Sequence, residues 1–470
     1  HSFPTRRSSD LCIMSSITKR SKYEIDMCNG TIMDKLISFS LPLMLSGILQ
    51  LMFNAVDIIV IGRFSGSQSL AAVGSTTALI NMFTNLFIGI SLGANVLSAR
   101  FYAAGKDKEM SETVHTAITL ALISGIIMVF VGLIFAKPVL ELMDTPDDVI
   151  NLSTLYMRIY FMGMPFFMLY NYGASILRAV GDTKRPLFFL IIAGIANAGL
   201  NMCLVIIFHL GVAGVAIGTV ISQFISSVLV LRCLYQSQTS YQLRFSKLKI
   251  NVEYLEQIFQ VGIPAGIQST VINFSNVLLQ SSVNSFGSIA MAGYTAANNI
   301  FGFLYVTVNA VTQACMSFTS QNYGVGKWKR MDRVLIDCLI LSFIAMMILG
   351  NSAYFFGPKL LTIYTSNPKV IQCGMEILLY TTVTYFLCGF MDLFPGALRG
   401  MGRSGVPMIL SIIGTVGTRI VWIFWIFPSH RSLDILFISY PVSWIITIIL
   451  QVICYYFVRK QLYGKKIAQA

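Results

Sequence analysis

Long apolar stretches alternate with short polar ones along most of the chain. We count twelve of them, at about residues 36–61, 72–99, 114–136, 152–177, 187–208, 211–231, 256–284, 290–318, 334–356, 374–398, 406–427 and 435–458. A helix that crosses the hydrocarbon core of a bilayer needs about 20 residues. The boundary between the fifth and sixth stretches is the least distinct, since only His209-Leu210-Gly211 separates them. The pattern predicts an all-α polytopic membrane protein with twelve transmembrane helices.

The composition excludes most soluble classes of protein. Apolar residues make up 55% of the chain and charged residues only 11%, whereas about 25% of a typical soluble domain is charged. The net charge of +13 comes from charges scattered between the apolar blocks, so we expect no nucleic-acid partner. The nine cysteines form no CxxC pair and the four histidines are far apart. We therefore expect no metal site and no cofactor.

The basic residues lie mainly on one side of the predicted membrane. The two termini and the loops that follow even-numbered spans carry 26 of the 33 Lys and Arg residues. Because cytoplasmic loops are enriched in Lys and Arg, we expect both termini to be cytoplasmic, in a multi-pass protein of the cell membrane. The acidic loop at 141–148 is then expected outside.

Two loop motifs occur twice, and both pairs are separated by the same offset along the chain. Gly105-Lys-Asp-Lys-Glu-Met110 returns as Gly326-Lys-Trp-Lys-Arg-Met331, and the Arg178–Pro186 motif with Gly181 returns at Arg399, Gly402 and Pro407. A shift of six spans keeps the orientation, so the two halves are predicted to be parallel repeats. Transporters with parallel repeats bind their substrate between the halves.

The repeat divides the chain into predicted parts. Residues 33–235 form an N-lobe with the first six helices, and residues 256–458 form a C-lobe with the last six. A loop at 236–255 joins the lobes, and tails lie at 1–32 and 459–470. Residues 1–11 (HSFPTRRSSDL) are unlike the rest of the chain and are interpreted as an artefact, either a cloning remnant or a translated sequencing adapter.

These markers resemble the MATE family, the multidrug and toxic compound extrusion transporters. The resemblance runs from about residue 33 to the end and rests on the stretches Leu41–Gly62, Leu70–Gly74, Leu177–Pro186, Leu398–Pro407 and Ser439–Trp444. It implies two six-helix lobes around a V-shaped cleft. It also implies export of cationic, amphipathic compounds by antiport with H⁺ or Na⁺. We expect the bilayer, such cations and the coupling ion as partners, and a monomer.

Asp57 is the sharpest candidate for the coupling chemistry. It lies near the outer end of the first span, and a carboxylate in a span costs about 2.5–3.5 kcal/mol, so such residues are usually functional. An ion and a cationic drug can then compete for one negative site. The alternative is an interfacial Asp that reaches water. Pro42, four turns earlier, removes a backbone hydrogen bond and permits a bend in this helix, or is an ordinary static kink.

Asn197 and Asn201 share a face of the fifth span, where amides also serve as helix–helix contacts. The resemblance places them on the family's Asn-x-x-x-Asp pair, opposite the first-helix acid. Asn201 replaces the Asp of that pair, and Phe53 stands where many relatives have Tyr. The missing oxygens weaken sodium binding more than proton binding, so H⁺ coupling through Asp57 is favoured and Na⁺ stays open.

The C-lobe candidates are less specific. One branch of the family carries a Glu and an Asp for Na⁺ at the positions of Ile272 and Cys388, so that site is expected to be absent. Asp392 lies one turn beyond Cys388, and it could substitute or could pair with Arg399. The weaker polar candidates in the seventh span are Gln268 and Asn273. Arg419, inside the eleventh span, receives no assigned role.

Two other classes of function compete with cation export. A flippase of lipid-linked oligosaccharides, from the same superfamily, would need several cations facing the cleft, and the spans contain only Arg158 and Arg419. A membrane-embedded enzyme would need a close polar catalytic cluster, which the sequence lacks. No Walker A motif is present, so ATP is not the direct energy source. We therefore expect a transporter and no enzyme.

Overall fold

The computed structural model describes residues 22–143 and 145–467, and every regular element in those ranges is helical. Residues 1–11, interpreted above as an artefact, lie outside the described part. The N-lobe elements are α2 (Met33–Phe64), α3 (Gly66–Ala103), α4 (Asp107–Leu142), α5 (Asp147–Met162), α6 (Met164–Ala179), α7 (Lys184–Met202), η1 (Cys203–Ile207) and α8 (Gly211–Gln236).

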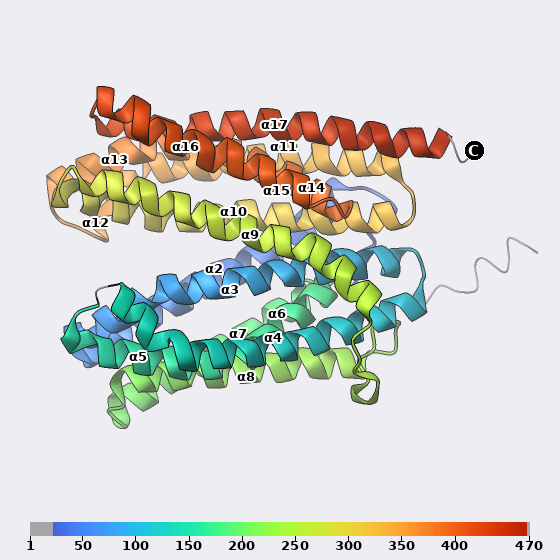
Figure 1. Cartoon of the computed structure of the whole chain (residues 1–470), viewed down its shortest axis with the longest axis horizontal. Helices are drawn as coiled ribbons and strands as arrows, with labels where there is room; N and C mark the ends of the chain where they lie inside the picture. The colour runs from blue at the N-terminus through green and yellow to red at the C-terminus, as the bar shows by residue number, and fades with distance from the viewer. Residues whose placement is uncertain (1–21, 144, 468–470) are drawn as a thin grey trace, which may run out of the picture.

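The C-lobe follows a short linking segment that contains η2 (Phe245–Lys247). Its elements are α9 (Val252–Asn284), α10 (Ser288–Gly324), α11 (Trp328–Phe355), α12 (Gly357–Thr362), α13 (Pro368–Thr382), α14 (Tyr385–Gly400), α15 (Gly405–Ser411), η3 (Ile412–Gly417), α16 (Thr418–Val421), η4 (Trp422–Ile426), η5 (Phe427–Ser429) and α17 (Leu433–Ile467). In Figure 1 the N-lobe is the lower bundle and the C-lobe the upper one, and α9 runs obliquely between them.

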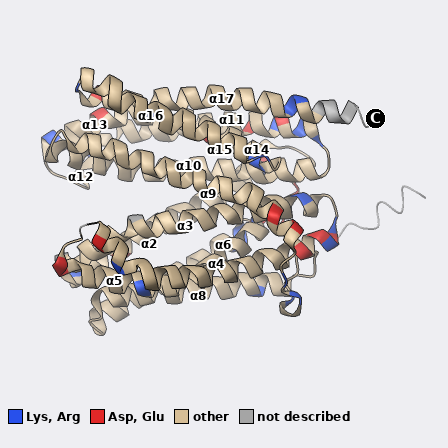
Figure 2. Ribbon diagram, in the orientation of Figure 1, with Lys and Arg blue, Asp and Glu red and all other residues tan. Residues whose placement is uncertain are grey.

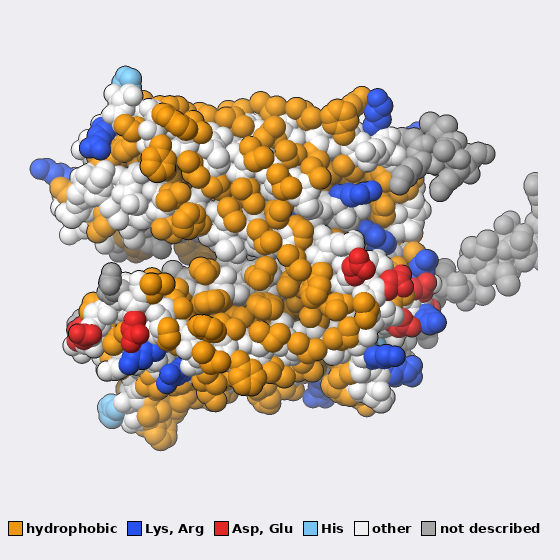
Figure 3. Space-filling view, in the orientation of Figure 1, with side chains coloured by type: hydrophobic (Ala, Val, Ile, Leu, Met, Phe, Trp, Pro, Cys, Tyr) orange, Lys and Arg blue, Asp and Glu red, His pale blue; other side chains and the backbone are white. Residues whose placement is uncertain are grey.

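The helices confirm the predicted fold class. Within the described residues nine helices are long and apolar enough to cross a membrane, and the pair α13–α14, bent by 44°, brings the number to ten. The predicted fourth and seventh spans coincide with α5–α6, which meet at Gly163, and with α9. Charged residues gather at the two ends of the helices and are scarce between them (Figure 2). Apolar side chains cover the middle of the visible face (Figure 3).

The internal repeat is visible in the backbone of two equivalent turns. Gly181 follows α6 and Gly402 follows α14, with φ of 97° and 80°. Glycine adopts this region without steric cost, which explains why both copies of the motif retain it. The same hydrogen bond, 2.9 Å long in each copy, closes both turns: from the Asp182 amide to the Leu177 carbonyl, and from the Arg403 amide to the Leu398 carbonyl.

The prolines of the two motifs also occupy matching places. Pro186 is the third residue of α7 and Pro407 the third residue of α15, where a missing N–H leaves no helical hydrogen bond unmade. Each carbonyl accepts a hydrogen bond from its own lobe, Pro186 from the Tyr170 hydroxyl at 3.2 Å and Pro407 from the Gln451 amide at 2.7 Å. These turns are structural anchors of the repeat.

Glycines allow the two lobes to pack closely where α3 crosses α9. Gly89 lies against the backbone of Gly266, and Gly93 lies against the carbonyl of Ile258. A Cβ at either position would collide with the facing backbone, so only glycine permits this helix crossing. Farther along, the Asn95 side chain of α3 accepts a hydrogen bond from Ser317 of α10 at 3.0 Å.

The segment before α2 crosses from one lobe to the other at the end of the molecule where α3 and α10 end and α9 begins. Glu24 accepts hydrogen bonds from the hydroxyls of Tyr102, at the end of α3, and Tyr241, in the segment that joins the lobes, at 2.6 and 2.7 Å. Slightly later in the chain, the Met27 carbonyl accepts from Asn322 and Arg330 of the C-lobe, at 3.1 and 3.2 Å. At the opposite end the lobes part and leave an opening (Figure 3). The lobes are therefore joined at one end and open at the other.

Candidate functional site

Asp57 lies in a cluster of neutral polar side chains from three N-lobe helices. It is 9% exposed and accepts a hydrogen bond from the Asn201 amide of α7 at 2.5 Å. The same amide nitrogen donates to Asn197 Oδ1 at 3.2 Å, and the Asn197 amide donates to Thr219 Oγ1 of α8 at 3.4 Å. Among the described residues Asp57 forms no ion pair, and Asn201 Oδ1 has no hydrogen-bond partner.

Small residues make room for this cluster. Gly218 of α8 lies directly against Asn201 Oδ1, and a Cβ there would collide with it. Two turns before Asn201 on α7, the ring of Phe53 of α2 lies against Gly194 where a side chain would otherwise stand. Phe53, expected to lack the family's phenol oxygen, thus fills space between α2 and α7.

Pro42 lies within α2, which continues as one helix from Met33 to Phe64. Its carbonyl accepts a hydrogen bond from the Ser46 hydroxyl at 2.8 Å. Because proline cannot donate to the preceding turn, this is the point at which α2 has one fewer internal bond. Just beyond this turn, Gly47 lies against Val306 of α10, so the weakened turn lies close to the lobe interface.

The polar candidates of the C-lobe do not form a counterpart of the Asp57 cluster. The Arg399 guanidinium donates to Gln268 Oε1 of α9 at 2.7 Å. The described residues show no ion pair between Asp392 and Arg399. Asn273 is exposed on α9. Arg178, the repeat partner of Arg399, instead reaches across to Gln313 of α10 at 2.6 Å.

Two residues of interest were not assigned a role from the sequence. Thr219 completes the Asp57 cluster, and the offset between the repeated motifs relates it to Tyr440, a member of the last family-like motif. The repeat offset from Tyr440 could therefore have indicated Thr219 from the sequence alone. Arg419 has a defined surrounding of its own: its guanidinium donates to Ser275 at 2.9 Å and to Asn276 at 2.8 Å.

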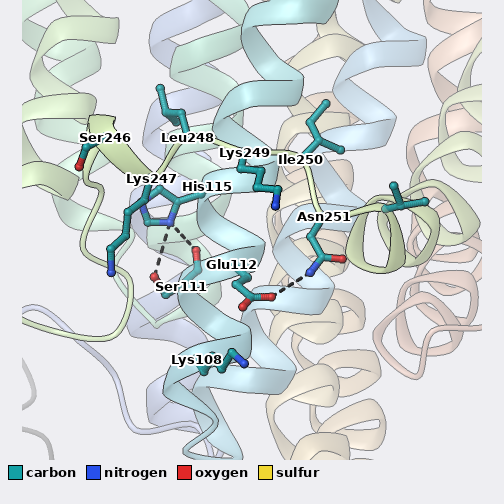
Figure 4. Close-up of a pocket in the computed structure, with 11 residues that line it drawn as sticks. Lys108, Ser111, Glu112, His115, Ser246, Lys247, Leu248, Lys249, Ile250 and Asn251 are labelled. Carbon is teal, nitrogen blue, oxygen red and sulfur yellow. Dashed lines mark hydrogen bonds between the residues drawn. The ribbon is translucent and has the colours of Figure 1, made fainter.

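A separate cavity of about 930 Å³ lies at the joined end of the molecule, between the start of α4 and the segment 246–252. Figure 4 shows His115 bonded to Ser111, and Asn251 bonded to Glu112 at 2.8 Å. Three lysines line the cavity with these residues. The contacts fix the inter-lobe segment on α4. Among the described residues, no three His, Cys, Asp or Glu side chains are placed to hold a metal ion.

The fold matches solved membrane transporters. One of them, described as the outward-facing conformation of a multidrug resistance MATE family transporter of the MOP superfamily, superposes with a TM-score of 0.88. It is 20% identical, and the match covers 95% of this chain and 100% of that one.

The family model MatE matches residues 42–203 and again residues 264–425, which together are more than half of the chain. The protein therefore belongs to the MatE family, and the model's matching twice, once in each lobe, agrees with the internal repeat. It is similar to the probable multidrug resistance protein YoeA of Bacillus subtilis, 29% identical with 90% of this chain and 93% of that protein covered. It is also similar to the multidrug export protein MepA of Staphylococcus aureus, 24% identical with 80% and 84% covered.

Proposed function

We propose that this protein exports cationic, amphipathic compounds by antiport with H⁺ or Na⁺, and that Asp57 is the site at which ion and substrate compete. The observation that carries the proposal is a buried carboxylate held only by neutral side chains, inside an apolar helix. A buried charge needs a counter-charge or must be neutralised. A proton would neutralise the Asp57 carboxylate, and a sodium ion or a cationic substrate would supply its counter-charge. Because there is one carboxylate, two of these cannot bind to it at once.

The oxygens around Asp57 are compatible with either ion. Asn201 turns its amide nitrogen toward the carboxylate, and its Oδ1, which lies against Gly218, has no hydrogen-bond partner among the described residues. This oxygen would therefore bind a cation at Asp57 only if the amide turns. Among the described residues this cluster contains one carboxylate, and hard cations bind best where several oxygens, some of them anionic, surround them. The donor set thus supports H⁺ as the first choice and Na⁺ as the second.

The proposed orientation follows from the charges. The joined end carries the N-terminal segment, the start of α11 and the end of α17, where Arg459 pairs with Asp332. The excess of Lys and Arg at this end favours a cytoplasmic location. Both termini are then cytoplasmic, the opening between the lobes faces outward, and the membrane is the cell membrane.

Transport into vesicles tests the proposal. The purified full chain is reconstituted in liposomes, a pH gradient and a Na⁺ gradient are imposed separately, and movement of a fluorescent cation is followed. The wild type should respond to at least one gradient. Asp57→Asn should lose about tenfold or more of that response, which corresponds to an interaction of about 1.4 kcal/mol.

The matched control is Asp392→Asn, the same change of carboxylate to amide in the other lobe. It should keep most of the gradient-driven transport. Near-normal transport by a well-folded Asp57→Asn protein would contradict the assignment of Asp57.

A further inference from the structure

The environment of Arg419 occupies, in the C-lobe, the region that the Asp57 cluster occupies in the N-lobe. The offset between the repeated motifs relates Tyr440 to Thr219, and it relates Arg419 to Ala198, the neighbour of Asn197. The three helices involved, α9, α16 and α17, correspond in the same way to α2, α7 and α8. Equivalent regions of the duplicated fold therefore hold buried charges of opposite sign.

Arg419 is surrounded by neutral groups. It is 3% exposed, and its NH1 nitrogen donates to Ser275 Oγ at 2.9 Å and to Asn276 Oδ1 at 2.8 Å. The guanidinium lies over the ring of Tyr440, 4.6 Å from its centroid. Within the described residues Arg419 forms no ion pair, and its Nε atom has no hydrogen-bond partner.

Neutral contacts do not compensate a buried guanidinium. Two hydrogen bonds and one aromatic face leave donors unused, since Arg carries five N–H groups in a planar fork that matches a carboxylate. The hydroxyl of Tyr440 is within hydrogen-bonding distance, 2.9 Å, of the hydroxyl of Tyr294. Asp392, the acid of α14, forms no ion pair with Arg419 among the described residues. The cluster therefore lacks an anion.

The polar face of α9 indicates how an anion reaches Arg419. Asn273, Asn276, Gln280 and Asn284 follow each other at intervals of three or four residues, so they share one face of this helix. Asn273 and Asn284 are exposed, and Asn276 and Gln280 are half-buried. A row of amides on a membrane-spanning helix faces protein or water rather than lipid. Since none of these amides is fully buried, the row provides a polar path along α9 to Asn276, which contacts Arg419.

We propose that Arg419, with Ser275, Asn276 and Tyr440, forms an anion-binding site in the C-lobe that holds the carboxylate of an amphiphilic substrate. The carboxylate would pair with the free side of the guanidinium fork, and its apolar body would lie along the aromatic side chains of Tyr440 and Tyr294. As a statement about transport, the inference rests on the proposed function, because it adds a second, oppositely charged contact to a substrate whose cationic group binds at Asp57.

Thermal unfolding of the purified full chain in detergent tests binding without requiring transport. Benzoate should raise the unfolding midpoint of the wild type in a saturable way, and neutral benzamide should not. Arg419→Gln should weaken the apparent affinity for benzoate at least about tenfold, as expected when a charge-assisted hydrogen bond is lost. Arg158→Gln, which removes an exposed arginine of α5, is the matched control and should respond as the wild type does.

Asn276→Asp keeps the test decisive if Arg419→Gln does not fold. A carboxylate at this position, 2.8 Å from the guanidinium, would supply the missing anion from within the chain. The variant should unfold at a higher temperature than the wild type and should no longer respond to benzoate. Equal stabilisation of wild type and Asn276→Asp by benzoate would overturn the proposal, and stabilisation by chloride alone would assign the site to a halide and overturn the carboxylate assignment.

A pair of dyes separates this inference from the proposed function. A rhodamine with a free carboxyl group and its methyl ester differ only in the anion. In vesicles, Arg419→Gln should transport the carboxylate form several-fold less while still transporting the ester, and equal loss of both would contradict the specific role. If the wild type transports neither dye, the proposed function fails while the benzoate result still decides the anion site.

Discussion

The two lobes share their backbone plan and differ in the charge at their centres. The turns at Gly181 and Gly402 are closed by the same hydrogen bond, yet equivalent regions hold Asp57 among amides in one lobe and Arg419 among amide and hydroxyl groups in the other. The duplication kept what the fold needs, a glycine with positive φ and a helix start. The buried charged side chains, in contrast, differ between the two lobes.

The equivalent helices α2 and α9 differ in the same sense. The polar face of α9 carries Asn273, Asn276 and Gln280, and the repeat offset places Met52, Ala55 and Ile59 at the equivalent positions of α2. All three residues of α2 are exposed. The exposed face of α2 is therefore apolar and has a buried acid behind it, whereas the corresponding face of α9 is polar and lies beside a buried base. Two such unlike helix faces suit an amphiphilic molecule better than a small inorganic ion.

The largest expected effect comes from crowding the Asp57 cluster. Gly218→Leu would drive a side chain into Asn201 and separate it from Asp57. Overpacking of this kind costs about 1–3 kcal/mol, so the unfolding midpoint should fall and transport should be lost. Gly199→Leu is the control, because a Cβ at Gly199 meets nothing within 4 Å. Equal damage by both substitutions would mean that leucine is not tolerated in either helix and that the Asp57 cluster is not specifically sensitive.

An intermediate effect is expected from restoring a second acid to the N-lobe. Asn201→Asp places a carboxylate beside Asp57, and two anionic oxygen groups hold a hard cation better than one. Transport should become several-fold more responsive to an imposed Na⁺ gradient. Asn273→Asp, which adds the same charge at an exposed position of α9, should not change the ion response. If transport by the wild type is already driven by a Na⁺ gradient and is unaffected by a pH gradient, the inference of H⁺ coupling from the number of carboxylates is wrong.

The smallest effects come from the hydroxyls at equivalent positions. Thr219→Val removes a hydrogen bond to Asn197, and Tyr440→Phe removes the one shared with Tyr294. Each should cost about 0.5–1.5 kcal/mol of stability, measured as a small fall in the unfolding midpoint. Transport of a cationic dye should fall more in Thr219→Val, since only that hydroxyl supports the Asp57 cluster. The reverse order would place the cation contact in the C-lobe.

Much of the fold follows from local sequence patterns. The length of the apolar stretches predicts the spans. The recurrence of glycine and proline at one offset predicts the repeat, because each of these residues is required by the backbone conformation of its turn or helix start. Within the site, the spacing of Asn197 and Asn201 predicts a shared face, and the structure shows both side chains there.

The partners of these residues depend on contacts between distant helices. Thr219 is one of many threonines in apolar helices, and only the packing of α8 on α7 distinguishes it. The bridge made by Glu24 and Met27 lies in a polar segment without periodicity. The surroundings of Arg419 likewise come from three helices that are far apart in the chain. Such arrangements follow from tertiary packing, which local patterns do not encode.

The most direct test of the account is competition between ion and substrate at Asp57. Binding of tetraphenylphosphonium to the purified full chain is measured as the pH is lowered at constant ionic strength, and again as Na⁺ replaces choline. If one carboxylate binds both, the wild-type affinity should fall by up to about tenfold per pH unit, or should fall with added Na⁺. Asp57→Asn should bind weakly and show neither dependence. Wild-type binding that is insensitive to both pH and Na⁺ would contradict the shared site.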